Sequence, residues 1–223
     1  MTPEETFVEI INRARENCSP ERLKLLVKFI GHDRIKDGLL VAPASSSVAY
    51  HHCYEGGLIS HIHQIIKIGL KFIDSMPKDL LTPQELVTTA ILHDIHKVCD
   101  HEGHSYYITN LLKSGKQSEA KPFKIAEEYG DFTKYVSNYN DIVLNYFAEN
   151  SSMKPTGHLS LMTLLHYSKE LYEDLTEDEK FAIVHHGGAY ETSGYSLAGK
   201  ENALQIILHA TDMLSSRYDS ADW

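Results

Sequence analysis

The chain has 223 residues, of which 42% are hydrophobic and 23% are charged, which excludes a disordered or fibrous protein and suits a single domain. Its 21 basic and 31 acidic residues give a formal net charge of −10. General binding to long duplex nucleic acid is therefore not expected, because the phosphate backbone needs a basic protein face. Histidine is unusually frequent, since its 14 copies outnumber the 13 glycines.

The three cysteines show none of the paired spacings of a zinc ribbon or a disulfide scaffold. The N-terminus lacks the basic and apolar regions of a secretory signal. No stretch approaches the roughly 18 apolar residues that cross a bilayer. We therefore expect a cytoplasmic protein without a membrane partner, and the sequence carries no signal for its oligomeric state.

Helical patterns open the chain. Apolar residues recur at helical spacing after Pro3, and a second helix is predicted from Pro20 to Gly31. Between Gly38 and Gly57 the pattern is irregular, which favours a loop.

The rest of the chain also predicts helices, and no alternating strand pattern of useful length is present. The predicted segments are 58–72, the stretch from the Thr82–Glu85 capping box to His93, the stretch from the Thr176–Glu179 box to His185, and 201–216. The predicted class is all-α, a helical bundle in which residues 1–40 form a helical extension packed on a main domain of residues 41–223.

Two polar stretches have open interpretations. Residues 99–140 carry a locally basic run that could be a phosphate-guiding flap or a solvated loop. The loop after His186 contains Tyr190 and Tyr195, which could stack on a base or belong to a flexible connection.

Two acidic residues are predicted to be buried and to need a cation. Asp94 closes the apolar run before it, and Asp212 shares a helical stripe with Leu204 and Leu208. A buried carboxylate without a partner costs several kcal/mol, and imidazole with carboxylate suits ions such as Fe, Mn or Zn. In the alternative, each histidine is a hydrogen-bonded core residue and Asp212 pairs with His209 or Arg217.

The histidines and acids also fall in an ordered set of motifs. These are Ala42-Pro43-Ala44-Ser45, His51-His52 with Gly56-Gly57 leading to His61, Leu92-His93-Asp94-Ile95-His96-Lys97, Gly157-His158, His185-His186-Gly187-Gly188, and Leu208-His209-Ala210-Thr211-Asp212. The set resembles the HD superfamily of metal-dependent phosphohydrolases, in the branch of small bacterial and phage HD proteins. It is also similar to the HD domain of certain 3′-to-5′ exoribonucleases, and the resemblance runs from about Ala42 to Asp212.

The resemblance implies a site with one or two divalent ions, which could be Mn, Fe, Ni, Co, Zn or Mg. One ion would be bound by His61, His93, Asp94 and Asp212. Asp94 would bridge to a second ion held by His158 and His185, with His186 as an alternative or additional ligand. Asp94 and Lys97 are the expected catalytic residues, and the expected substrate-binding residues are His52, Lys97 and His186.

The sequence departs from the family pattern at two positions. His96 stands where relatives usually have glycine, so it could crowd the site or offer another ligand. Ser60 replaces an acidic residue that often precedes the first histidine, which weakens the expected support of that ligand.

The resemblance implies hydrolysis of a phosphoester, on a nucleotide or another small phosphorylated metabolite, by metal-activated water. Two alternatives stay open. Some HD-fold proteins hold two irons in a similar shell and oxidise their substrate with O₂, and others could bind a nucleotide without turnover.

Overall fold

The structure of the chain is a computed structural model. It describes residues 1–45, 51–52, 54–77, 79–99, 157–188, 197 and 199–218, together with the backbone of 107–111, 121–122 and 144–146. Predictions for most of residues 99–140, and for Tyr190 and Tyr195, fall outside the described residues.

Three helices open the chain, α1 (Pro3–Asn17), α2 (Pro20–Ile30) and α3 (Asp33–Val41). The side chains of Thr2 and Ser19 cap the first two by accepting backbone hydrogen bonds from the residues three positions later. The expected loop from Gly38 is wrong for its first residues, because α3 continues to Val41. Ile35 and Leu39, four residues apart, are buried and hold this helix on the core.

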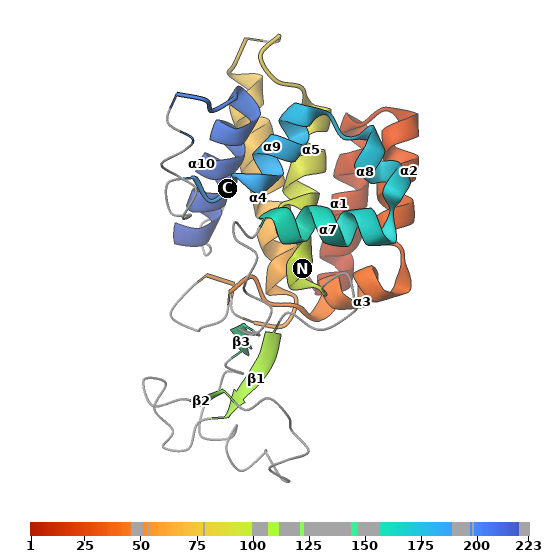
Figure 1. Cartoon of the computed structure of the whole chain (residues 1–223), viewed down its shortest axis with the longest axis vertical. Helices are drawn as coiled ribbons and strands as arrows, with labels where there is room; N and C mark the ends of the chain where they lie inside the picture. Colours follow the sequence, from red (N-terminus) through yellow and green to blue (C-terminus); the bar gives the residue numbers. More distant parts are fainter. Residues whose placement is uncertain are drawn as a thin grey trace.

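Two helices form the centre of the molecule, α4 (Gly57–Asp74) and α5 (Pro83–Leu92), and the short 3₁₀ helix η1 (Ile95–Lys97) follows. In Figure 1, α4 and α5 stand between the N-terminal helices and α10. Every residue of α5 from Leu86 to Leu92 is buried, because α1, α4, α9 and α10 all pack against this helix. A helix that is apolar all round belongs in a core.

The C-terminal part adds α7 (Gly157–Tyr167), α8 (Lys169–Asp174), α9 (Glu177–Val184) and α10 (Ala203–Arg217). The predicted capping boxes at Thr82 and Thr176 are both present. α10 packs against α4 and α9, so residues that are far apart in the sequence share one interface.

A small antiparallel sheet is also present, with the order β2-β1-β3. Its strands are β1 (Tyr107–Leu111), β2 (Lys121–Pro122) and β3 (Leu144–Tyr146). Asn110 pairs with Pro122, and Ile108 pairs with Asn145. These strands have at most five residues, so the all-α class is confirmed. Among the described helices, none is long and apolar enough to cross a membrane.

A buried ion-pair network joins the N-terminal helices to the rest. The Arg22 guanidinium in α2 donates to Glu179 in α9 and to Asp174 at the end of α8, with both N–O distances at 2.6 Å. It also donates to Thr88 in α5 at 3.2 Å. The first 40 residues therefore pack on the same core as the later helices, whereas a domain boundary near residue 40 stays a prediction.

Candidate metal centre

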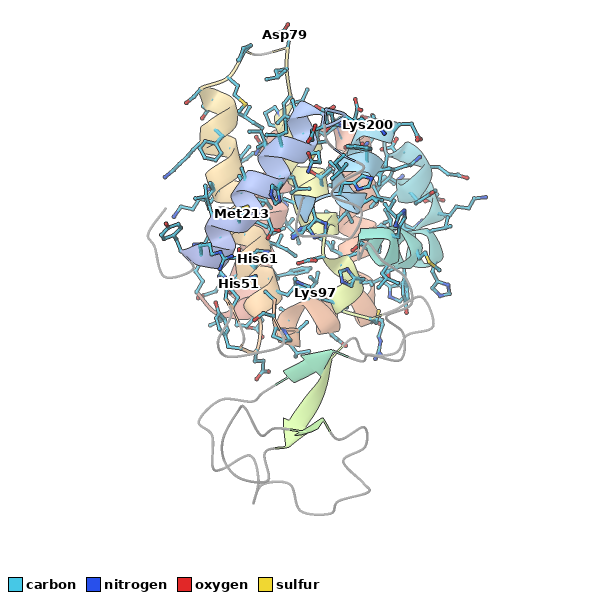
Figure 2. All side chains as sticks on the ribbon, turned by 60° about the vertical axis from the view of Figure 1, so that its left-hand side comes forward. His51, His61, Asp79, Lys97, Lys200 and Met213 are labelled. Atoms are coloured by element: carbon cyan, nitrogen blue, oxygen red, sulfur yellow. The ribbon has the colours of Figure 1, made fainter. Side chains whose placement is uncertain are left out.

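Three helices bring the predicted ligands to one place. His61 lies in the second turn of α4, His93 and Asp94 directly follow α5, and Asp212 lies in α10. Figure 2 shows His61 in the same region as Lys97 and at the opposite end of the helical body from Asp79.

The ligand atoms of these residues converge. One ligand atom from each of His61, His93 and Asp94 lies within 4.8 Å of the other two. The Nε2 atom of His61 is 3.1 Å from Oδ1 of Asp212, and Nε2 of His93 is 3.4 Å from Oδ2 of Asp94. Both imidazoles have no exposed surface, whereas the Asp212 side chain is 20% exposed, so the cluster extends from the core towards the surface.

The other ring nitrogen, Nδ1, is occupied in both histidines. Nδ1 of His93 lies 2.8 Å from the carbonyl oxygen of Ala90, which can only accept a hydrogen bond. Nδ1 of His61 lies 2.8 Å from Oγ of Ser215, whose single hydroxyl proton is donated to Oε1 of Gln64. Both Nδ1 atoms therefore carry a hydrogen, so the lone pair of each neutral imidazole lies on Nε2.

These lone pairs fit a metal ion. Among the described residues, Nε2 of His61 and Nε2 of His93 are buried, and each faces a carboxylate oxygen instead of a hydrogen-bond donor. A buried acceptor without a partner is costly, and an Nδ1–H group held by an oxygen is the usual support of a metal-bound histidine. The nitrogen and oxygen donor set suits a borderline divalent ion.

The two carboxylates are held in the charged form. Burial by itself would raise the pKa of Asp94, but Lys97 and His93 outweigh burial and hold this pKa well below its usual range. Burial would likewise raise the pKa of Asp212, and the hydrogen bond and charge of His61 lower it instead. The centre therefore offers two anionic ligands at neutral pH.

The two histidines respond differently to the same surroundings. Burial lowers the pKa of His61 despite the nearby Asp212 carboxylate. Burial also acts to lower the pKa of His93, but the charges of Asp94 and Asp212 raise it overall. A cation in the centre would take the place of the proton that the carboxylates favour on His93.

Comparison with known proteins identifies a relative. A dihydroneopterin 2′,3′-cyclic phosphate phosphodiesterase of Methanocaldococcus jannaschii is 30% identical over 232 aligned positions, which cover 93% of this chain and 90% of the relative. The chain belongs to the family of this phosphodiesterase. No protein-family model and no solved structure matches the chain.

In this member of the phosphodiesterase family, Lys97 and His186 contact Asp94 from different sides. Nζ of Lys97 donates to Oδ2 of Asp94 and to the carbonyl oxygen of Ala44, both at 2.6 Å. Nε2 of His186 lies 3.6 Å from Oδ1 of Asp94. Nδ1 of His186 is held 2.8 Å from the carbonyl oxygen of Ile183, so its Nε2 also presents a lone pair.

His158 and His185 do not reach Asp94. Among the described residues, the ion-pair contacts of Asp94 are with His93, Lys97 and His186. The ring of His185 packs on Phe181 with centroids 4.7 Å apart, and its pKa is lowered by burial and by the charge of His158. The structure thus brings His186 to the carboxylate that is predicted to bridge two ions, whereas the His185 ring lies against Phe181.

Two further histidines lie beside the centre. No ligand role is predicted for His51, whereas His96 is predicted either to crowd the site or to offer another ligand. The His51 ring lies 4.9 Å from the His61 ring, centroid to centroid. Nδ1 of the buried His96 lies 2.8 Å from Oγ of Ser160, which donates to the carbonyl oxygen of His93. His96 therefore buttresses the turn that carries His93. The sequence marks this position by a histidine where the family motif usually has glycine.

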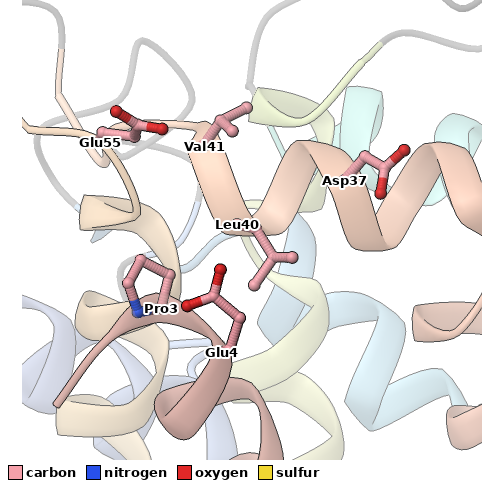
Figure 3. A pocket seen from close by; sticks show the side chains of 6 residues that line it. All are labelled: Pro3, Glu4, Asp37, Leu40, Val41 and Glu55. Atoms are coloured by element: carbon pink, nitrogen blue, oxygen red, sulfur yellow. The ribbon is translucent and has the colours of Figure 1, made fainter.

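A separate surface cavity of about 480 Å³ lies between α1, α3 and the turn before α4 (Figure 3). Three carboxylates line it, from Glu4, Asp37 and Glu55, beside Pro3, Leu40 and Val41. Carboxylates repel an anionic substrate, so the histidine centre is the better candidate for phosphate chemistry.

Proposed function

We propose that the chain is a metal-dependent phosphodiesterase of the HD type, acting on a small, nucleotide-like phosphodiester. The observation that carries the proposal is the pair of buried Nε2 atoms of His61 and His93, which face the charged carboxylates of Asp212 and Asp94. The relative, which by its name hydrolyses a cyclic phosphodiester, supports the choice of reaction.

The proposed ligand sets follow the contacts. His61, His93, Asp94 and Asp212 would hold one divalent ion. Asp94 and His186 would contribute to a second, in place of the His158 and His185 pair that the family resemblance implies. An ion in such a shell lowers the pKa of a coordinated water and polarises a phosphoryl oxygen.

The protein's own groups would position and stabilise the substrate. Lys97 is partly exposed and fixed by Ala44 and Asp94, so it would place a positive charge where the phosphoryl oxygens gain negative charge. In the hydrolysis of a cyclic ester, a water oxygen bonds to phosphorus, one phosphorus–oxygen bond of the ring breaks, and the released oxygen takes a proton. The product is a phosphomonoester with one free hydroxyl.

Purification without chelators, followed by elemental analysis and an assay with 2′,3′-cyclic AMP, tests the proposal. We expect bound Mn, Fe, Ni, Co or Zn, or activation by added Mg²⁺, and release of an adenosine monophosphate. Asp94→Asn should lose metal and turnover together while keeping its helical circular dichroism. Asp79→Asn, at the opposite end of the molecule, is the matched control (Figure 2).

Other outcomes would select an alternative. Full turnover by Asp94→Asn, or an active protein without any metal, would overturn the proposed centre. O₂ consumption with an oxo-bridged di-iron absorption band would instead indicate an oxygenase. Nucleotide binding without product release under every metal would indicate a binding module.

A further inference from the structure

A series of rings leads from the candidate metal centre to the protein surface. The His52 ring is 5.6 Å from the His61 ring, and the Tyr54 ring is 5.8 Å from the His52 ring, centroid to centroid. His52 is buried, whereas the Tyr54 side chain is 51% exposed. An aromatic ring therefore lies at the rim, one imidazole away from a metal ligand.

The backbone of His52 adopts an unusual conformation. Its φ of 47° lies in the left-handed region, which a residue with a side chain rarely occupies. Such a conformation persists only where the surroundings enforce it, and it often occurs at functional sites.

Two contacts enforce this conformation. The backbone N–H of Ala44 donates to the carbonyl oxygen of His52 at 3.1 Å. Gly57 packs so closely on the same oxygen that a Cβ atom at position 57 would lie 1.9 Å from it. The turn before α4 is thus fixed from both sides, and it holds the His52 ring between His61 and Tyr54.

The chemistry of His52 and Tyr54 differs from that of the metal centre. Asp94, Asp212 and Lys97 supply charge for metal and phosphate, whereas His52 contributes a buried ring and Tyr54 an exposed one. An exposed tyrosine ring that is joined to the charged centre through one histidine ring suits a ligand with a phosphate at one end and a planar ring at the other, because such a ring stacks on any aromatic side chain.

We propose that Tyr54, supported by the buried His52 ring, forms a stacking wall for a planar heterocycle carried by the substrate and is a specificity-determining residue. The substrate class is then a phosphodiester that bears a heterocyclic ring, such as a nucleotide. This inference rests on the proposed phosphodiesterase function. It adds the recognition of the organic group, to which neither the metal ligands nor Lys97 would contribute.

The test compares a substrate that has a ring with one that lacks it. Wild type, Tyr54→Leu and Tyr54→Phe are assayed with 2′,3′-cyclic AMP and with glycerol 1,2-cyclic phosphate. For Tyr54→Leu, we expect KM for cyclic AMP to rise by on the order of tenfold, as for loss of one stacking contact, with kcat unchanged. KM for the glycerol ester should not change, and Tyr54→Phe should behave as wild type.

Phe72→Leu is the matched control, because Phe72 is also exposed but lies at the far end of α4. Metal content and circular dichroism should be equal in all four proteins. Equal KM values for wild type and Tyr54→Leu, or the same rise in KM with both substrates, would overturn the stacking wall while leaving the phosphodiesterase proposal intact.

A binding measurement keeps the test independent of turnover. Calorimetric titration with adenosine 3′-monophosphate should show weaker binding to Tyr54→Leu than to wild type or Phe72→Leu. If wild type hydrolyses neither ester, the proposed function fails, and this titration alone still decides the wall. Equal affinities of wild type and Tyr54→Leu would refute it.

Discussion

At the scale of single residues, the orientation of each imidazole is set by what its Nδ1 atom contacts. Nδ1 of His93 and Nδ1 of His186 each lie 2.8 Å from the carbonyl oxygen of the residue three positions earlier. Each histidine follows within two residues of the end of a helix, α5 for His93 and α9 for His186. The geometry leaves their Nε2 atoms directed at the Asp94 carboxylate, 3.4 Å and 3.6 Å away. The two helix ends thus place equivalent side chains on either side of one acid.

This arrangement distinguishes His186 from its neighbour His185. We expect His186→Gln to lower the amount of metal bound per chain and to reduce phosphodiesterase activity by at least about tenfold, because a ligand beside Asp94 is lost. His185→Gln should retain the metal content of wild type, since the His185 ring contacts Phe181 instead. Elemental analysis and steady-state kinetics on both variants check this, and the reverse order of effects would restore His185 as the ligand.

At the scale of elements, α10 positions the turn that carries these two histidines. Gln205 donates to the carbonyl oxygen of His185 at 2.9 Å, and Nδ1 of His209 lies 2.7 Å from the carbonyl oxygen of His186. The same helix supplies Asp212 to the centre and Ser215 to His61. One helix therefore aligns both ends of the candidate site.

A second contact between elements, the Arg22 network, governs stability rather than chemistry. Arg22→Met leaves the Glu179 carboxylate, whose side chain is 1% exposed, without its guanidinium partner. Removal of one partner of a buried ion pair costs about 3–5 kcal/mol, and we expect a loss of that size in the free energy of unfolding. Urea denaturation followed by circular dichroism measures it.

Lys28→Met is the control for Arg22→Met. Lys28 also belongs to α2 and also forms an ion pair, but its partner Glu170 is exposed and the pair lies in solvent. A similar loss of stability in both variants would show that burial of the Arg22 network is not what matters.

At the scale of the whole molecule, the buried histidines make the metal-free protein sensitive to acid. Burial lowers the pKa of His51 to about 3 and that of His96 to about 3, from an ordinary value of 6.5. Burial also lowers the pKa of His61 and His186, and only His93 among the histidines of the centre is shifted upward. Below pH 6.5 the unfolded chain therefore binds more protons than the folded one.

It follows that stability falls as the pH is lowered from about 6.5 towards 3. We expect the urea midpoint of the metal-free protein to be lower at pH 5.5 than at pH 7.5. His96→Gln should show a smaller drop, because one depressed histidine is removed. A midpoint that is constant or rises on acidification would contradict this assignment of the buried charges.

Much of the architecture followed from local sequence patterns. The two capping boxes after residue 80 and the apolar spacings predicted helices because caps and periodicity act within a few residues. Helix α3 was not predicted, because Gly38 and the irregular stretch after it obscured the helical spacing of Ile35 and Leu39. Both residues are buried, and their packing on the core stabilises this helix.

For the candidate site, the sequence by itself determined that His93-Asp94 ends a buried helix and that Asp212 shares a stripe with leucines. It could not determine which histidine of the pair 185–186 meets Asp94, nor that Ser215 supports His61 across 154 positions. Helical periodicity places a side chain on a face of its own helix, whereas the rotation of that helix against distant ones arises from packing. The ligand geometry was therefore decided only when α4, α5, α9 and α10 came together.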